Sequence, residues 1–248
     1  MDNDDRQVGT VLTRRDALAV LGSAGALMLT GFGPAGGGTR GARAQQQAGC
    51  VVRPRQTEGP YFVDELLNRS DIRSDPGNSG AVRPGVPLQL GFNVSRLAAG
   101  TCAPLVGALV DVWQCDHLGV YSDVQDPGFN SRGQKFLRGY QLTDAAGHVR
   151  FTTIYPGWYQ GRTVHIHFKI RSAPNTRPGY EFTSQLYFDD AMTDRVFELA
   201  PYADRCRRST RNANDRIFRR ESGTQLILAV AGDAQGYAGT FDVALQAA

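Results

Sequence analysis

Two histidines separated by one residue, His165 and His167, lie in a run that alternates with apolar residues, and they follow two tyrosines, Tyr121 and Tyr159, each preceded by a glycine-containing turn. The side chains of a β-strand alternate between its two faces, so both imidazoles point the same way, about 7 Å apart at their Cα atoms. That spacing allows the two rings to bind one ion. The four side chains therefore predict a metal site.

The ligand types indicate which metal such a site would take. Imidazole suits several transition metals, whereas phenolate is a hard, anionic oxygen donor that favours a highly charged hard ion. Two phenolates with two neutral imidazoles predict Fe(III). Because free tyrosine has a pKa near ~10, the charge of the metal must drive its ionisation at neutral pH. The other two histidines, His117 and His148, sit in turn-like sequences and are expected to be solvated.

Each of these features also has an ordinary structural explanation. A pair of histidines on a strand can be no more than a polar face, and tyrosines next to turns are common. Tyr61, Tyr140 and Tyr155 are alternatives to the two tyrosines chosen above. Trp113, which alternates with Asp111 on its strand, could pack in the core or near the metal, and packing in the core is expected. The surrounding sequence must decide between the two explanations.

The elements that would position these residues follow from hydrophobic periodicity. Residues 85–97 alternate, with Leu88, Leu90, Phe92 and Val94 on one face. Further β-patterned runs occupy residues 107–114, 136–142, 148–154, 163–171, 183–188, 225–230 and 240–245. About eight short strands at regular spacing predict an all-β fold, an antiparallel β-sandwich with long loops. Only residues 190–199 are predicted to be helical, with Thr193 or Asp194 as the cap.

The first 44 residues have the pattern of an export signal. Arg14 and Arg15 precede an apolar stretch at residues 17–29, and small residues at 42–44 suit cleavage before Gln45. The arginine pair predicts a twin-arginine signal, with the export machinery as a partner and a periplasmic or extracellular location. The apolar stretch is shorter than the ~20 residues that span a bilayer, so no permanent membrane anchor is expected. Twin-arginine export carries folded proteins, which suits a chain that acquires its metal in the cytoplasm.

The remaining residues, 45–248, are predicted to form one catalytic domain. The chain has 248 residues, 41% of them hydrophobic and 21% charged, as in an ordinary globular protein. A net charge of +3, without a basic stripe interleaved with aromatic residues, argues against nucleic-acid binding. The densest basic run, residues 205–208, is expected to be a solvated loop.

All four cysteines lie in this part of the chain, namely Cys50, Cys102, Cys115 and Cys206. An oxidising compartment makes disulfides plausible. A bond between Cys102 and Cys115 is not expected, because the intervening strand would hold their Cα atoms farther apart than ~7 Å. The two other pairing schemes, with Cys50 bonded to Cys102 or to Cys115, remain open. No cysteine spacing predicts a thiolate metal site.

Four segments carry a family resemblance: residues 57–62 (Thr-Glu-Gly-Pro-Tyr-Phe), residues 112–122 with Gly-Val-Tyr, residues 136–139, and residues 153–168 with Pro-Gly-Trp-Tyr and His-Ile-His. Together they resemble the intradiol ring-cleavage dioxygenases, in order, over about residues 53–188. The resemblance is closest to the exported, single-domain branch related to catechol and protocatechuate dioxygenases, since no helical dimerisation segment is expected ahead of the core.

The resemblance implies a mononuclear, non-haem ferric ion held by Tyr121, Tyr159, His165 and His167. It implies that Tyr159 is the labile, axial phenolate, which leaves the metal and accepts a proton when a catecholate binds. Tyr159 would thus act both as a ligand and as a base.

The resemblance also implies roles for residues around the ligands. Arg162 would lie beside the bound ring and stabilise negative charge that builds on it. Gln185 would form a hydrogen bond near the axial ligand. Thr57, Gly59 and Pro60 would line the mouth of the substrate pocket, where a small glycine and a rigid proline can shape one wall.

The reaction implied is cleavage of the ring of a catechol between its two hydroxyl-bearing carbons. Both atoms of O2 would enter the product, a cis,cis-muconate-type diacid. The sequence leaves the particular catechol open and is compatible with a homo-oligomer. One alternative function is a secreted β-sandwich module that binds a metal or phenolics without turnover. An Fe(II) extradiol enzyme is not expected, because it needs a carboxylate ligand beside two histidines and no His-x-Asp or His-x-Glu occurs.

Overall fold

The structure is a computed structural model that describes residues 50–76, 80–177, 179–205 and 207–246. These residues belong to one compact unit. The predicted export signal and Cys206 lie outside the described residues. Within the described ranges, no helix is both long and apolar enough to cross a membrane.

Four antiparallel strands form the sheet that carries the two histidines. In spatial order they are β11 (Glu181–Tyr187), β10 (His165–Arg171), β5 (Leu109–Trp113) and β8 (Arg138–Leu142). Strand β10 lies between β11 and β5, so hydrogen bonds along both of its edges hold the backbone of the histidine pair. In this register His167 is opposite Gln185 on β11 and Trp113 on β5.

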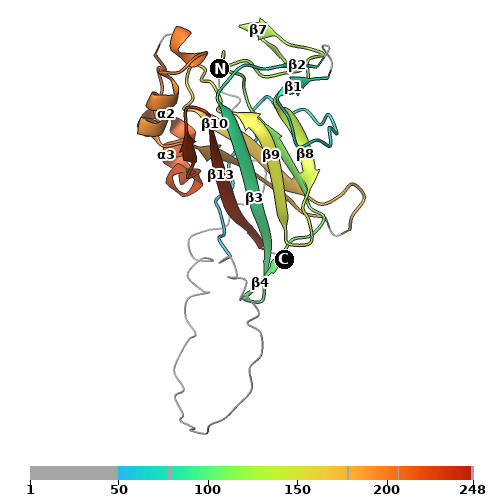
Figure 1. Ribbon diagram of the computed structural model, residues 1–248. Coiled ribbons are helices and arrows are strands. Elements are labelled where there is room, and N and C mark those ends of the chain that lie inside the picture. The colour runs from blue at the N-terminus through green and yellow to red at the C-terminus, as the bar shows by residue number, and fades with distance from the viewer. Residues whose placement is uncertain (1–49, 77–79, 178, 206, 247–248) are drawn as a thin grey trace, which may run out of the picture. The chain divides into compact units, whose positions relative to one another are not determined.

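A five-stranded sheet forms the second layer of the sandwich. Its strands are β12 (Ala231–Asp233), β13 (Gly236–Gln246), β3 (Pro87–Ala98), β4 (Thr101–Pro104) and β9 (His148–Ile154). Strands β13, β3 and β9 lie side by side in Figure 1, and β4 pairs with the end of β3. Two short hairpins, β1 (Ser74–Asp75) with β2 (Ala81–Val82) and β6 (Gln125–Asp126) with β7 (Phe129–Asn130), lie outside the two sheets.

The all-β class is confirmed, with one difference in the pairing of its strands. Strand β13 runs parallel to β3, whereas the other strand pairs listed above are antiparallel. A parallel neighbour requires a long connection through the rest of the chain. The short spacing between successive strand patterns predicts antiparallel hairpins, so it could not predict the parallel pairing of β3 with β13.

The hydrophobic core lies between the two sheets. Leu88, Leu90 and Phe92 of β3 face Phe168 of β10, and the rings of Phe92 and Phe168 are 5.2 Å apart at their centroids. Burying each such side chain contributes about 1.5–3 kcal/mol. Because residues 166, 168 and 170 of β10 face this core, the alternating residues 165 and 167 must face the opposite side of the sheet.

The helical segments differ from the prediction. Helix α2 spans Asp190–Val196, and its cap is Asp189, which accepts a hydrogen bond from the Met192 N–H at 2.9 Å, so neither Thr193 nor Asp194 is the cap. A second helix, α3 (Arg216–Arg220), was not predicted because five residues are too few to show a helical period.

The strand expected at residues 225–230 is wrong. Its start belongs to a 3-10 turn, η4 (Gly223–Leu226), and Ile227 makes only an isolated bridge to Tyr187. Two other 3-10 turns, η2 (Tyr202–Asp204) and η3 (Asn212–Asn214), lie between the helices.

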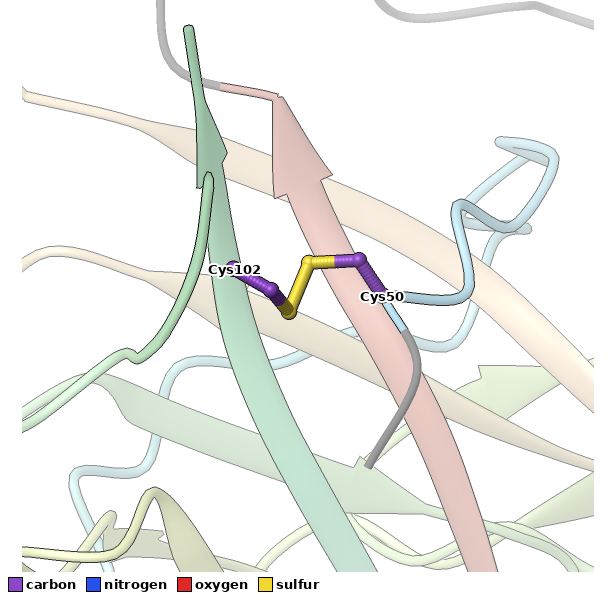
Figure 2. Close-up of a disulfide and its surroundings, with 2 residues drawn as sticks. All are labelled: Cys50 and Cys102. Atoms are coloured by element: carbon purple, nitrogen blue, oxygen red, sulfur yellow. A yellow bond between two sulfur atoms is a disulfide. The ribbon is translucent and has the colours of Figure 1, made fainter. Parts of the chain in front are cut away.

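A disulfide joins Cys50 to Cys102, with their Cα atoms 5.6 Å apart. Figure 2 shows Cys50 beside strand β13 and Cys102 on β4, so the bond ties the first described residue to the edge of the second sheet. Of the two pairing schemes left open, the one with Cys50 bonded to Cys115 is excluded. Cys115 is a free, buried thiol in the described part of the chain, so the second bond of the remaining scheme, between Cys115 and Cys206, is wrong.

Candidate metal centre

The two histidines of β10 bring their Nε2 atoms within 3.1 Å of each other. Both side chains are buried. Nδ1 of His165 lies 2.6 Å from the carbonyl oxygen of Thr163, to which it must donate a hydrogen. The lone pair of the neutral ring is therefore on Nε2, the atom that faces His167.

Both predicted tyrosines reach the same atom. The Oη atoms of Tyr121 and Tyr159 lie 3.3 Å and 3.2 Å from Nε2 of His165. Tyr121 is fully buried, whereas Tyr159 is partly exposed. The structure thus brings together four donor atoms from the loop after β5, the loop before β10 and β10 itself.

Two glycines allow the two tyrosine-bearing loops to pack backbone against backbone. A Cβ on Gly119, two residues before Tyr121, would lie 2.4 Å from the carbonyl oxygen of Trp158. A Cβ on Gly157 would lie 2.3 Å from the carbonyl oxygen of Asp116. The glycines of the Gly-Val-Tyr and Pro-Gly-Trp-Tyr motifs thus permit the close approach of the loops that carry the phenols.

The electrostatics of this cluster suit a bound cation. Burial lowers the pKa of His165 and of His167 well below the usual value, so both rings are neutral. Burial likewise raises the pKa of Tyr121 well above its usual value, so its phenol stays protonated unless a metal cation is bound beside it. Nδ1 of His167 is a buried atom without a hydrogen-bond partner among the described residues. The convergent lone pairs fit a metal ion with oxygen and nitrogen ligands.

The tyrosines are essential to any such site. In the ranges that the structure describes, no group of three or more histidine, cysteine, aspartate or glutamate side chains is placed to hold a metal. Of the other two histidines, His148 is exposed as expected, while His117 is half-buried against the edge of Tyr202.

Aromatic residues surround two of the four side chains. Trp113 stacks on the imidazole of His167, with centroids 5.0 Å apart and an angle of 9° between the rings. Trp113 is buried as expected, but in a small cluster with Cys115 and Tyr121 on the histidine face of the sheet, not between the two sheets. Tyr61 stacks on Tyr121 at 4.4 Å and donates a hydrogen bond to Asp126 at 2.8 Å. Both contacts restrict rotation of the rings that they cover.

Arg162 lies beside the cluster and is buried. Its NH1 atom is 3.5 Å from Nε2 of His165, and its NH2 atom donates to Oε1 of Gln185 at 2.5 Å. Gln185 in turn donates from Nε2 to the carbonyl oxygen of Thr57 at 3.0 Å. The sequence-predicted residues 57, 162 and 185 therefore form one connected chain of hydrogen bonds.

The other two residues expected at the pocket mouth follow Thr57 in a turn. The N–H of Gly59 donates to Oγ1 of Thr57 at 3.2 Å, and Gly59 has a φ of 71°, which glycine adopts readily. Pro60 is exposed. Their contact with a substrate stays a prediction.

Two charged residues of this region were missed from the sequence. Asp215 is fully buried and accepts a hydrogen bond from Nε of Arg162. Arg138 is buried and donates to Oγ of Ser122 at 2.7 Å and to the carbonyl oxygen of Tyr61 at 3.3 Å. Burial lowers the pKa of Arg138 to about 10, which leaves it charged at neutral pH. Arg138 belongs to the segment 136–139 that carried the family resemblance, but its role was not predicted. Asp215 stands immediately before helix α3, and an aspartate at a helix cap was the local signal for it.

The basic run at residues 205–208 is not simply a solvated loop. Arg205 donates to the carbonyl oxygens of His117 and Trp158, at 3.0 Å and 2.9 Å. The side chain of Arg208 is 4% exposed and forms ion pairs with Asp190 and Asp194. The prediction failed because paired arginines and solvated arginines look alike in sequence.

Comparison with known proteins gives consistent results. A family model described as "Dioxygenase" matches residues 57–211. Catechol 1,2-dioxygenase 2 of Acinetobacter lwoffii is 32% identical over 161 residues, covering 55% of this chain and 51% of that protein. The protocatechuate 3,4-dioxygenase beta chain of Burkholderia cepacia is 32% identical, covering 67% of this chain and 68% of that one. The chain thus spans about half the length of the first relative and two thirds of the second.

A solved structure is similar over nearly its whole length. It is an intradiol ring-cleavage dioxygenase from Tetranychus urticae, 30% identical, with a TM-score of 0.67, and the match covers 79% of this chain and 95% of that one.

Proposed function

Because this chain belongs to the intradiol ring-cleavage dioxygenase family, we propose that it is an Fe(III)-dependent enzyme that opens the ring of a catechol-type substrate between its two hydroxyl-bearing carbons. Both atoms of O2 enter the product, a cis,cis-muconate-type diacid. One observation carries the proposal: two phenol oxygens and the Nε2 atom of His167 all lie within 3.1–3.3 Å of Nε2 of His165.

Tyr121, Tyr159, His165 and His167 would hold the metal. When bound, a ferric ion would supply the positive charge that ionises the phenols, and it would attract the two oxygens of a catecholate substrate. Burial keeps the imidazoles neutral and therefore able to donate their lone pairs. The carbonyl of Thr163 fixes the ring orientation of His165, as partners of metal-binding histidines commonly do.

Tyr159 is proposed to accept a proton at Oη from a hydroxyl group of the substrate. Among the four ligands it is the partly exposed one, while the other three are buried. A ligand that moves aside when substrate binds needs free space next to it. The partial exposure of Tyr159 supports this role. Proton uptake by a positioned side chain contributes about 10²–10⁴-fold to a rate.

Arg162 is proposed to stabilise negative charge that develops on the substrate ring. A guanidinium stays protonated, and its charge acts most strongly where water is excluded. Its NH1 atom faces the ligand cluster, because its Nε and NH2 atoms are hydrogen-bonded to Asp215 and Gln185. The turn with Thr57, Gly59 and Pro60 would form one wall of the substrate pocket.

We also propose that the protein is exported to the periplasm or the extracellular space.

The test uses purified protein, catechol and ¹⁸O2. We expect a ring-opened diacid that carries two ¹⁸O atoms, and no such product from a His167→Ala variant, which should lose its iron. A protein that binds catechol or metal yet consumes no O2 would instead support the alternative of a binding module. A product opened outside the two hydroxyl-bearing carbons would contradict the intradiol assignment.

A further inference from the structure

We propose that Asp215 is a positioning residue for Arg162 and for the start of strand β10. This inference rests on the proposed function, since it concerns the residue that would stabilise charge on the substrate. Asp215 lies 53 residues beyond Arg162 in the sequence, in the segment between α2 and α3. It has 0% exposure, so its charge must be matched by nearby groups.

The two carboxylate oxygens of Asp215 have separate tasks. Oδ1 accepts a hydrogen bond from the N–H of Phe218 at 2.9 Å and thereby caps helix α3. Oδ2 accepts from Nε of Arg162 at 2.9 Å and from the N–H of Thr163 at 2.8 Å. Helix capping explains only the first oxygen, whereas the second contacts the residues that lead into the histidine pair.

The contact with Asp215 decides which part of the guanidinium faces the metal centre. Asp215 holds Nε of Arg162 on one side, and Oε1 of Gln185 holds NH2 at 2.5 Å on the other. Two anchors on different elements fix the plane of the guanidinium, and NH1 is then directed to Nε2 of His165 at 3.5 Å. Without Asp215, a buried cation would lose a carboxylate partner and one of these two hydrogen bonds.

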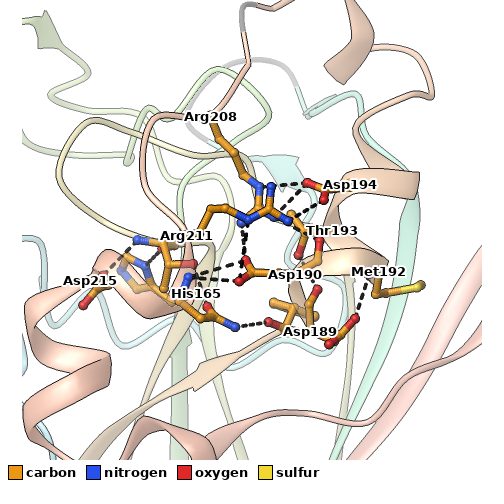
Figure 3. A network of polar contacts seen from close by, with 12 residues as sticks. His165, Asp189, Asp190, Met192, Thr193, Asp194, Arg208, Arg211 and Asp215 are labelled. Atoms are coloured by element: carbon orange, nitrogen blue, oxygen red, sulfur yellow. Dashed lines mark hydrogen bonds and ion pairs between the residues drawn. The ribbon is translucent and has the colours of Figure 1, made fainter.

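The segment that carries Asp215 is itself tied down by ion pairs, shown in Figure 3. Arg208 contacts Asp190 at 2.5 Å and Asp194 at 2.8 Å, and Arg211 contacts Asp194 at 2.6 Å. These pairs join the segment to helix α2. Arg208, from the basic run at residues 205–208, therefore helps to hold the segment that carries Asp215.

Asn212 adds a second connection from this segment to Thr163, two residues before strand β10. Its Nδ2 donates to the carbonyl oxygen of Phe188 at 2.8 Å, and its Oδ1 accepts from Oγ1 of Thr163 at 2.7 Å. Thr163 therefore has both its N–H and its hydroxyl bonded to residues of this segment. Its carbonyl oxygen accepts from Nδ1 of His165, so the contacts reach the ligand.

The test compares two matched substitutions at helix caps. Asparagine is as good a cap as aspartate, so Asp215→Asn preserves the cap of α3 while its amide N–H₂ faces Arg162 and Thr163, which are both donors. Asp189→Asn makes the same change at the cap of α2. We expect Asp215→Asn to retain iron and catechol affinity within about twofold while kcat falls at least about tenfold, and Asp189→Asn to leave kcat unchanged.

A double-mutant cycle shows whether Asp215 acts through Arg162. In an Arg162→Leu background, Asp215→Asn should have little further effect on kcat. An equal fall of kcat in both backgrounds, or a fall in iron content without a change in kcat per iron, would overturn the proposal.

A measurement without turnover keeps the proposal testable if the wild type proves inactive or Asp215→Asn does not fold. In the wild-type protein, with Ga(III) in place of any iron that it holds, the Nε–H proton of Arg162 should give an NMR signal that exchanges slowly with water. The signal is assigned by its loss in Arg162→Lys. Rapid exchange of that proton would overturn the role of Asp215, whereas inactivity of the wild type with a protected proton would overturn only the proposed function.

Discussion

At the scale of single residues, the four ring side chains of the proposed metal centre differ in their access to solvent. Tyr121, His165 and His167 are buried among aromatic neighbours, whereas Tyr159 is partly exposed. Chemically similar phenols therefore occupy different environments. The difference supports distinct tasks for them, a permanent ligand and a ligand that can move.

Replacing Tyr159 with phenylalanine tests this division. Tyr159→Phe removes both a phenolate and a proton acceptor while leaving three ligands, so kcat should fall by about 10²-fold or more and part of the iron should remain. Steady-state kinetics with metal analysis measures both effects. Tyr140→Phe, at a tyrosine on strand β8, is the control and should behave as wild type. Unchanged kcat in Tyr159→Phe would refute the role of base.

The residues that could be predicted from sequence are those whose partners lie close along the chain or within a familiar motif. The histidine pair shares a face by strand alternation alone, and the tyrosines stand in glycine-containing turns. Asp215 could not be predicted, because its contact with Arg162 depends on how the segment after α2 folds back. The layer in which Trp113 is buried could not be predicted, because alternation gives two faces of a strand without saying which one lies between the sheets.

At the scale of elements, the centre depends on two loops that meet at glycines. Gly119 has a φ of 86° and leaves no room for a Cβ beside the carbonyl of Trp158, whereas Gly133 has a φ of 82° and open space around it. Gly119→Ala should therefore separate the loops that carry Tyr121 and Tyr159. Gly133→Ala has the same backbone strain without the clash.

We expect Gly119→Ala to lower iron content and activity at least about tenfold, and Gly133→Ala to lose only about 1 kcal/mol of stability with its iron retained. Metal analysis and thermal unfolding of the two variants measure these effects. Equal iron content in both variants would show that loop contact is unimportant for the site.

An ion pair attaches the segment around Asp64 to the end of strand β10. Arg171 holds Asp64 through two hydrogen bonds, of 2.6 Å and 2.9 Å, and this contact lowers the pKa of that carboxyl below its usual value. Because the pKa of Asp64 is lower in the folded than in the unfolded state, the ionised carboxylate stabilises the fold above pH ~4. This contribution to the free energy of unfolding is lost as the pH falls through the folded-state pKa. Because Asp64 is largely exposed, the effect should stay below about 1 kcal/mol.

Asp64→Asn should therefore be less stable than wild type at pH 6–7 and equal to it near pH 2. Chemical denaturation across this pH range measures the difference. A gap between the two proteins that widens as the pH falls would contradict the assigned ion pair.

Most of the longer strands could be predicted, because hydrophobic residues at every second position mark the strand face that packs in the core. β9 matches the prediction residue for residue, and β3, β5, β8, β10 and β11 differ only at their ends. The run at residues 225–230 alternates for another reason: Leu226 and Leu228 are buried at an isolated bridge beside β11. Short helices and the parallel β3–β13 pair depend on contacts that local patterns do not contain.

At the scale of the whole molecule, one disulfide fastens the beginning of the described chain to the second sheet. The bond between Cys50 and Cys102 closes a loop with a sequence separation of 52 residues. Replacing both cysteines with serine should lower the free energy of unfolding by about 2–4 kcal/mol and leave kcat per iron unchanged. Denaturation with and without a reductant measures this, since the reductant should affect only the wild type. Equal stability of variant and wild type would contradict a structural role for the bond.

The described residues form a two-layer β-sandwich that carries the proposed chemistry on the outer face of one sheet. One face of β10 builds the core, and the alternating residues of the same strand supply two of the four proposed ligands. A strand held on both edges by neighbours gives these ligands a rigid base, while the phenols come from loops. The arrangement allows the loops to vary between relatives without altering the core.

The visible absorption spectrum of the purified protein under air, before and after addition of catechol, tests the central claim most directly. Two phenolates bound to Fe(III) should give a broad charge-transfer band, which shifts when catechol is added and is greatly weakened in a variant with both Tyr121→Phe and Tyr159→Phe. An iron-loaded protein without such a band, or a band that persists unchanged in the double variant, would contradict a ferric centre held by these tyrosines and histidines.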